Sequence, residues 1–335
     1  MSDRVLVSGG TGVIGGRLVE LLRKARVPVR ILTRSVAAGQ RVSDSNVETL
    51  RWDGIHLPDG ALRGCSSVVH LAGEPVFGGP LTAARRHRIA SSRIESTRSI
   101  AEALRATPSA DRPASFVCGS AVGFYGSRGE EVLDESAGPG SGFLSEICQQ
   151  WEAAAATAAD ALRVVSLRTG IVMARNAGAL PMMALPFRFG FGGRMGNGRQ
   201  WVPWIQIDDA VSLIHRVLQD DAFHGAVNAV APHPIRNAEL TTEIARTLRR
   251  PCLLPVPAFA LRIALGNLSV ELLGSRRCIP QRMLDVGFEF AHTDIGSALA
   301  VELGRSPSER ERGGWWIFTP PQTGSLIMRA ALTRG

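Results

Sequence analysis

The stretch VLVSGGTGVIGGRLVELL, from Val5 to Leu22, constrains the fold more than any other part of the chain. It opens with the apolar residues of a short strand, continues through closely spaced glycines, and then carries leucines at helical spacing. Glycines permit a tight turn and the close approach of a pyrophosphate, and the N-terminus of the following helix supplies amide donors. This order predicts a dinucleotide-binding loop at the start of a sheet. The alternative is an ordinary glycine-rich turn between a strand and a helix.

The same alternation of strand and helix continues along the chain. Strands are predicted at 4–8, 27–33, 47–52, 66–72, 115–121 and 162–168, and long helices at 83–106 and 144–161. Strands that alternate with helices indicate a parallel sheet covered on both faces. The right-handed crossover rule then predicts an α/β fold with a doubly wound sheet.

The character of the sequence changes after Pro232. Residues 1–235 are predicted to form the nucleotide-binding domain, and residues 236–303 a small, mostly helical cap. Residues 304–335 are charged and then broken by proline and glycine, so we expect a tail extension that is loose or disordered, unless Trp315 and Trp316 dock it.

The first two strands indicate which dinucleotide is bound. The loop residues predicted to contact it are Gly9, Thr11, Gly12, Val13, Ile14 and Gly15. The second strand ends in Thr33, Arg34 and Ser35, where sites that prefer NAD usually carry an acidic residue. A guanidinium suits a 2′-phosphate because it pairs with phosphate through two hydrogen bonds. The sequence therefore predicts NADP(H), the alternative for Arg34 being a surface arginine.

The next two strands add residues to the same predicted site. Asp53 follows the third strand, where it could hold the adenine amine or cap a turn. Leu71, Ala72 and Gly73 follow the fourth strand and would place bare backbone beside the cofactor. Glu74 comes next, at the strand end where doubly wound sheets bind their substrates.

Composition excludes several other classes of function. The net charge is +8, but the arginines are scattered without interleaved aromatic residues, which argues against a nucleic-acid partner. The five cysteines have no metal-type spacing, and the histidines are isolated, so we expect no metal site and a reducing compartment. The sequence shows neither a signal peptide nor an apolar run of membrane-spanning length, so we expect a cytoplasmic protein without a membrane partner.

Three motifs in order, GGTGVIG, HLAGEP and SAVGFYG, carry a family resemblance. With GFLSEICQQWE (142–152), LRTGIVMA (167–174), GNGRQWVPWIQIDD (196–209) and the segment 250–290, they make the chain similar to the extended short-chain dehydrogenases/reductases. It resembles most the atypical branch of epimerase-family proteins. The resemblance implies a Rossmann domain that binds NADP, followed by a small domain of unknown function. It implies no particular substrate.

The resemblance also identifies what this chain lacks. The wider superfamily uses a serine and a YxxxK pair, in which the lysine lowers the pKa of the tyrosine and holds the nicotinamide ribose. Those two positions fall on Phe143 and Ile147, and the serine position falls on Ala121. The only lysine, Lys24, and the only tyrosine, Tyr125, cannot form the pair at their spacing.

Three residues remain as catalytic candidates, namely Tyr125, Ser120 and Glu74. We expect Tyr125 to be structural, with recruitment to catalysis as the alternative. A buried Glu74 would have a raised pKa and could act as a general acid or base, unless it serves as the partner of Arg93. We expect Asp208 and Asp209 to cap the helix that they begin.

These observations predict an NADP(H)-dependent oxidoreductase or epimerase that acts on a small-molecule substrate, for example one that resembles a sugar nucleotide. The alternative is a non-catalytic NADP-binding regulatory or scaffold protein, for example one related to cell division. The helices at 83–106 and 144–161 could form a homodimer interface or be covered within a monomer.

Overall fold

The computed structural model describes residues 4–35, 45–76, 79, 81–252, 255–266 and 268–304. The predicted tail extension is 304–335, and of it all but Gly304 lies outside these residues. Within them, no helix is both long and apolar enough to cross a membrane.

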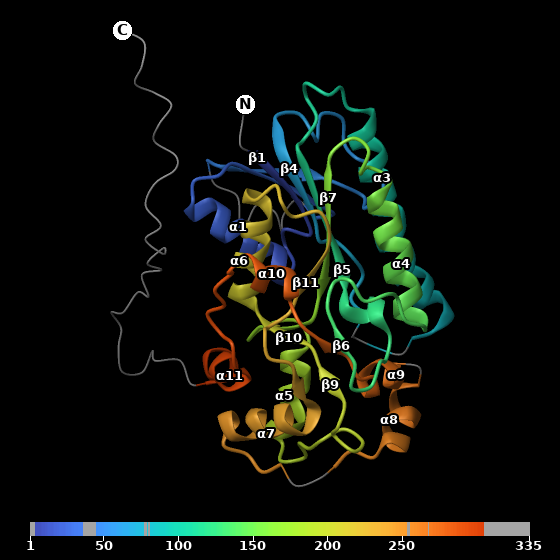
Figure 1. The fold of residues 1–335 in the computed structure, drawn as a ribbon, viewed down its shortest axis with the longest axis vertical. Helices are drawn as coiled ribbons and strands as arrows, with labels where there is room; N and C mark the ends of the chain where they lie inside the picture. Colours follow the sequence, from blue (N-terminus) through green and yellow to red (C-terminus); the bar gives the residue numbers. More distant parts are fainter. Residues whose placement is uncertain are drawn as a thin grey trace. The chain divides into compact units, whose positions relative to one another are not determined.

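A parallel sheet forms the centre of the described chain (Figure 1). Its strands are β1 (Arg4–Ser8), β2 (Val29–Thr33), β3 (Val47–Arg51), β4 (Cys65–His70), β5 (Ser115–Ala121), β7 (Arg163–Thr169) and β11 (Gly225–Ala229). They lie in the order β11-β7-β5-β4-β1-β2-β3, and every neighbouring pair is parallel. The strand order reverses between β1 and β4. The predicted doubly wound α/β sheet is therefore confirmed.

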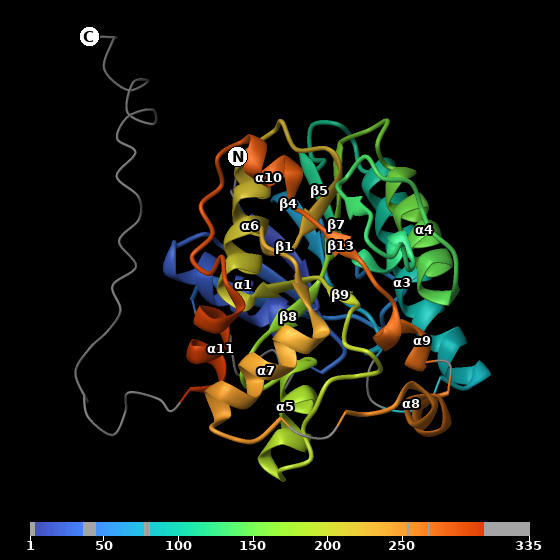
Figure 2. The same cartoon turned by 60° about the horizontal axis from the view of Figure 1, so that its bottom comes forward.

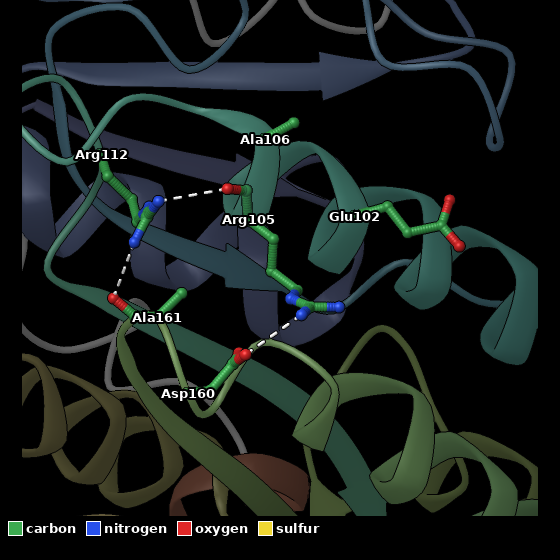
Figure 3. Close-up of a pocket in the computed structure, with 6 residues that line it drawn as sticks. All are labelled: Glu102, Arg105, Ala106, Arg112, Asp160 and Ala161. Atoms are coloured by element: carbon green, nitrogen blue, oxygen red, sulfur yellow. Dashed lines mark hydrogen bonds and ion pairs between the residues drawn. The ribbon is translucent and has the colours of Figure 1, made fainter.

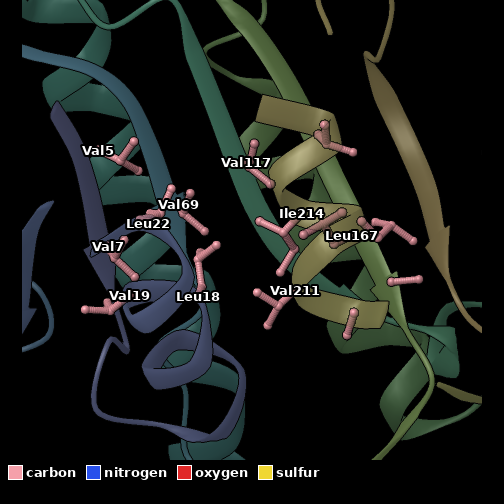
Figure 4. Close-up of a cluster of buried hydrophobic side chains, with 14 of the residues drawn as sticks. Val5, Val7, Leu18, Val19, Leu22, Val69, Val117, Leu167, Val211 and Ile214 are labelled. Carbon is pink, nitrogen blue, oxygen red and sulfur yellow. The ribbon is translucent and has the colours of Figure 1, made fainter. Parts of the chain in front are cut away.

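Alternating side chains of the strands bury both faces of the sheet. Val5 and Val7 of β1 face one cluster, which includes α1 (Val13–Lys24) and α6 (Ile207–Gln219), whereas Leu6 faces the other (Figure 4). The second cluster is covered by α3 (Ala83–Ala106) and α4 (Phe143–Ala156). This period of two is what a strand covered by helices on both faces requires.

A further layer lies beyond the carboxyl end of β7 (Figures 1 and 2). Its strands pair as β8 (Ile171–Met173) with β10 (Trp204–Gln206), β9 (Trp201–Val202) with β12 (Ile235–Arg236), and β6 (Val132–Leu133) with β13 (Arg277–Cys278). Its helices are η1 (Val122–Tyr125), α5 (Leu180–Arg188), α7 (Asn237–Leu248), α8 (Ala258–Leu265), α9 (Leu268–Leu273) and α11 (Ile295–Leu303). The helix α10 (Gln281–Asp285) lies apart from this layer, at the start of β11, where Arg282 donates to the carbonyl of Ala226 at 2.9 Å. Residues of α5, α7 and α11 share one hydrophobic cluster.

The segment after residue 250 packs against several different hydrophobic clusters. Met283 of α10 belongs to the cluster under α1 and α6, and Leu299 of α11 to the cluster around α5 and α7. Cys278 packs near Tyr125, and Leu268 of α9 packs with Ile147 of α4. The predicted boundaries of the cap, 236–303, stay a prediction, because the described residues up to Gly304 form one compact unit.

Candidate functional site

The turn after β1 meets the end of β4 at the point where the strand order reverses. Gly9 has a φ of +72°, a conformation that favours glycine. A Cβ on Gly9 would lie 2.8 Å from the main-chain nitrogen of Ala72 and from the carbonyl carbon of Leu71. Open α/β sheets bind ligands at this reversal. The two predicted cofactor segments are therefore in direct contact.

The rest of the loop turns the start of α1 toward the same crevice. The amide of Gly12 donates to the carbonyl of Gly9 at 2.8 Å, and a Cβ on Gly15 would lie only 2.2 Å from that carbonyl oxygen. No side chain caps α1, and its first turn has no acidic residue. Val13 and Ile14 are partly buried, and their side chains pack against the core. The free first-turn amides fit a phosphate.

The end of β2 presents a cation. The hydroxyl of Thr33 accepts from the amide of Ser35 at 3.2 Å and donates to its carbonyl at 3.3 Å, which closes a short turn. Arg34, between them, is exposed and forms no ion pair or hydrogen bond with the other described residues. Its guanidinium is available to an anionic ligand.

Asp53 has the geometry of a turn cap. One carboxylate oxygen accepts from the amides of Ile55 and His56 at 2.7 and 2.8 Å, and the other lies 2.7 Å from Nδ1 of His56. The His56 side chain and these amides lower the pKa of Asp53 to about 2. Both oxygens are used locally, so the geometry favours the turn-capping alternative over contact with adenine.

Tyr125 is fully buried, and its hydroxyl is bound inside the protein. The hydroxyl oxygen lies 2.7 Å from Oδ1 of Asn228 and 2.9 Å from the carbonyl oxygen of Asp134, and it accepts from Arg168 at 3.0 Å. Burial raises the pKa of this phenol, and the nearby guanidinium opposes that effect only in part. These contacts favour the structural role over recruitment to catalysis.

Ser120 belongs to the same polar network. Its hydroxyl donates to Oε1 of Glu152 at 2.6 Å, and Glu152 binds Arg168 through two contacts of 2.9 Å. The network joins β5, α4, β7 and η1. No motif in the sequence points to Glu152 or Arg168, although a charge at the end of a buried strand is a signal that a partner is needed.

Glu74 is partly buried and its main chain is held on both sides. Its amide donates to the hydroxyl of Ser92 at 3.0 Å, and Nη1 of Arg93 donates to its carbonyl at 2.8 Å. The predicted alternative, Glu74 as a partner of Arg93, holds for the main-chain carbonyl of Glu74 and not for its carboxylate. Among the described residues, no ion pair involves that carboxylate.

The comparisons with known proteins agree with this geometry. The model of the NAD dependent epimerase/dehydratase family matches residues 5–230. The chain belongs to this family. A domain of unknown function matches residues 256–301. The family thus covers both the sheet and the contact between Gly9 and the end of β4.

Relatives match over most of their length. An epimerase family protein of Arabidopsis thaliana, SDR39U1 homolog, chloroplastic, is 34% identical over 88% of this chain and 85% of its own. The human epimerase family protein SDR39U1 is 34% identical over a region that covers 88% of this chain and 98% of its own. A crystal structure of human SDR39U1 (isoform 2) with NADPH aligns with a TM-score of 0.79 at 31% identity, covering 89% and 98% of the two chains.

The positions of the superfamily's tyrosine and lysine are apolar in this family member. Ile147 is buried beside Ile89 and Leu268, and Phe143 packs against the same cluster. Lys24 lies at the end of α1, where its Nζ is 2.8 Å from Glu20. The described chain therefore has no tyrosine–lysine pair at the expected place.

The start of α6 corrects one prediction. Gln206, not Asp208 or Asp209, caps this helix: its Oε1 accepts from the amides of both aspartates at 2.5 and 3.2 Å. Asp208 instead pairs with Arg17 of α1 at 2.5 Å. Asp209 accepts from the amide of Ala291 at 2.7 Å, so both aspartates tie α6 to other elements.

A surface depression lies at the opposite edge of the sheet (Figure 3). It is bounded by the end of α3 and by the residues that precede β5 and β7. Arg112 donates there to the carbonyls of Arg105 and Ala161, and Arg105 pairs with Asp160 at 3.1 Å. These contacts are structural. Among the described residues, no group of three or more His, Cys, Asp or Glu could hold a metal ion.

Proposed function

We propose that this chain is an NADP(H)-dependent oxidoreductase or epimerase of the atypical extended short-chain type. The observation that carries the proposal is the contact of Gly9 with the main chain of Leu71 and Ala72. This contact leaves the first-turn amides of α1 facing the crevice at the strand reversal, where a pyrophosphate fits. The crystal structure of human SDR39U1 with NADPH, which aligns over 98% of its own chain, supports the same assignment.

The residues at the end of β2 favour NADP(H), with its 2′-phosphate, over NAD. Arg34 is exposed there without an anionic partner among the described residues, and its neighbours in sequence are Thr33 and Ser35. A guanidinium binds a 2′-phosphate through charge-assisted hydrogen bonds, whereas a carboxylate would repel it.

Bound NADP(H) supplies hydride transfer at its nicotinamide. The residues of this chain bind it, orient it and hold a proton beside it. Tyr125 and Ser120 are committed to the buried network, which leaves Glu74 as the candidate general acid or base. Its main chain is fixed at the carboxyl end of β4. We propose that a small-molecule substrate binds between this edge and the segment 236–303.

Cofactor titration tests the first part of the proposal. We expect NADPH to bind more tightly than NADH, and Arg34→Ala to weaken NADPH by about tenfold or more while leaving NADH unchanged. Arg98→Ala, at an exposed arginine on α3, is the matched control. Failure of the wild-type protein to bind either dinucleotide would overturn the proposal.

A turnover screen tests the second part. NADPH consumption on a panel of carbonyl compounds and sugar nucleotides should fall by at least about tenfold in Glu74→Gln, since general acid–base groups typically contribute 10² or more. Glu95→Gln, an exposed glutamate on α3, should leave the rate unchanged. Turnover that survives Glu74→Gln would exclude Glu74 as the proton-transfer group.

A further inference from the structure

Arg93 of α3 lies against the end of β4. Its Nη1 donates to the carbonyls of Glu74 and Ile89 at 2.8 and 3.1 Å, and its Cζ lies 5.2 Å from the centre of the Trp151 ring. A Cβ on Gly73 would come within 3.2 Å of that Cζ. The bare backbone at Gly73 thus lets the guanidinium reach the edge of the sheet.

This guanidinium has no counter-ion among the described residues. Arg85, also buried, likewise donates only to main-chain carbonyls, whereas three other arginines form ion pairs. Arg30 pairs with Glu48, Arg168 with Glu152 and Arg276 with Glu271. Arg93 is partly buried, and the loss of water lowers its pKa, which the nearby Cys148 and Glu74 oppose. Within the described chain its Nε and Nη2 have no hydrogen-bond partner. These two nitrogens are not fully buried, so an anionic or oxygen-rich ligand can reach them and would suit a cation that has lost most of its water.

The topology shows which part of a dinucleotide reaches Arg93. The pyrophosphate fits at α1 beside Gly9, and the adenosine half extends toward β2, where Arg34 stands. The other half extends across the reversal toward β4 and β5. Arg93 lies on that side, against Gly73, which comes three residues after β4 ends at His70.

The adjoining wall is mostly apolar and carries another cation, Arg86, whose Cζ lies 5.6 Å from the centre of the Phe143 ring. Phe143 and Ile147, at the positions of the superfamily's tyrosine and lysine, pack in an apolar cluster with Ile89. Trp151, one turn after Ile147 on the same helix, carries the guanidinium on its ring. Arg93 of α3 thus places a positive charge beside the wall of α4, which lacks the lysine of the superfamily.

We propose that Arg93 binds the ribose and phosphate oxygens of the nicotinamide half of NADP(H). Its Nε and Nη2 donate to those oxygens, while Nη1 stays bound to Glu74 and Ile89. This inference rests on the proposed function. Arg93 is a binding and positioning residue, and no chemical step is assigned to it.

Two ligands separate the halves of the cofactor. NADPH contains both halves, whereas adenosine 2′,5′-bisphosphate contains only the adenosine side with its 2′-phosphate. We expect Arg93→Met to weaken NADPH by about tenfold or more and to leave the bisphosphate unchanged. Arg34→Ala should weaken both ligands. Arg98→Met, an exposed arginine on the same helix, should affect neither.

Calorimetric titration of the full chain measures these affinities without turnover. Arg93→Lys should restore part of the loss, because it keeps the charge but not the planar fork. Should Arg93→Met fail to fold, Arg93→Gln tests the same loss of charge with a side chain that keeps a hydrogen-bond donor. Thermal unfolding of each variant verifies its fold.

Two results would overturn the inference while leaving the proposed function intact. In the first, Arg93→Met binds NADPH as tightly as the wild-type protein. In the second, it weakens NADPH and the bisphosphate equally, which indicates general damage to the site. If the wild-type protein binds neither ligand, the proposed function fails together with the inference.

Discussion

Arg168 on β7 and Glu152 on α4 form a two-contact ion pair in which both nitrogen–oxygen distances are 2.9 Å. Their side chains are only 6% and 15% exposed. The same guanidinium donates to Tyr125 and lies 3.5 Å from the centre of the Phe124 ring. The pair therefore fixes η1, the turn that follows β5, against the carboxyl edge of the sheet.

Removing one partner should leave an uncompensated buried charge. We expect Glu152→Ala to lower the free energy of unfolding by about 3 kcal/mol. Asp160→Ala removes the exposed partner of Arg105 and should cost less than about 1 kcal/mol. Urea unfolding followed by circular dichroism measures both. Equal effects of the two substitutions would contradict the structural role of the pair.

Tyr125→Phe separates a structural tyrosine from a catalytic one. The variant loses the hydroxyl bonded to Asn228, Asp134 and Arg168, so we expect a loss of stability of about 1–2 kcal/mol. NADPH affinity should stay within twofold of the wild-type value. Unchanged stability together with a large loss of turnover would show that Tyr125 has been recruited to catalysis.

Two neighbouring glycines provide a matched test of the loop. A Cβ on Gly15 would lie 2.2 Å from the carbonyl oxygen of Gly9, whereas one on Gly16 would lie 3.5 Å from that of Gly10, an ordinary contact. Gly15→Ala should therefore weaken NADPH binding by at least about tenfold, because the loop must shift away from the pyrophosphate. Gly16→Ala should bind normally and be at least as stable, since alanine favours helices. Similar affinities in the two variants would argue against this loop geometry.

His70 predicts a dependence of stability on pH. It is fully buried between Ser8 and Ser96, and burial lowers its pKa to about 3, with a contribution from Arg93. The unfolded chain, with a pKa near 6.5, binds a proton that the folded chain rejects. The stability due to neutral His70 is therefore complete above about pH 6.5 and is lost as the pH falls toward 3.

Urea unfolding at pH 7.5 and pH 5 measures this loss. We expect the difference in unfolding free energy between the two pH values to shrink by about 2 kcal/mol in His70→Gln, because each pKa unit corresponds to about 1.4 kcal/mol. His87→Gln, at an exposed histidine on α3, should retain the wild-type difference. An unchanged difference in His70→Gln would show that this histidine does not cause the dependence.

Local patterns predicted the regular elements well. The bounds of β1, β5 and α3 agree with the predicted 4–8, 115–121 and 83–106. The predicted helix 144–161 ends earlier, at Ala156, because an alanine-rich pattern does not mark where a helix stops. The paired strands beyond the sheet join residues far apart in sequence, so no local period reveals them.

Side-chain partners were harder to predict than elements. Gln206 caps α6 although glutamine is not a usual capping residue, and two aspartates next to it offered the more familiar choice. Glu152 and Arg168 are 16 positions apart on a helix and a strand, so only the fold brings them together. The sequence suggests Arg93 only as a partner of Glu74, and its lack of a counter-ion among the described residues is visible only in three dimensions.

The C-terminal segment after residue 250 packs into several parts of the fold and does not form a separate lid. Four of its residues each belong to a different hydrophobic cluster, namely Leu268, Cys278, Met283 and Leu299. The cluster of Met283 includes strands of the large sheet, that of Cys278 includes the turn after β5, and that of Leu268 includes Ile147 of α4. A rigid rotation of this segment would have to open several packed cores at once. We therefore expect a ligand to enter through local movement of side chains and loops, and a chain cut at residue 250 to lose its nucleotide site together with the segment.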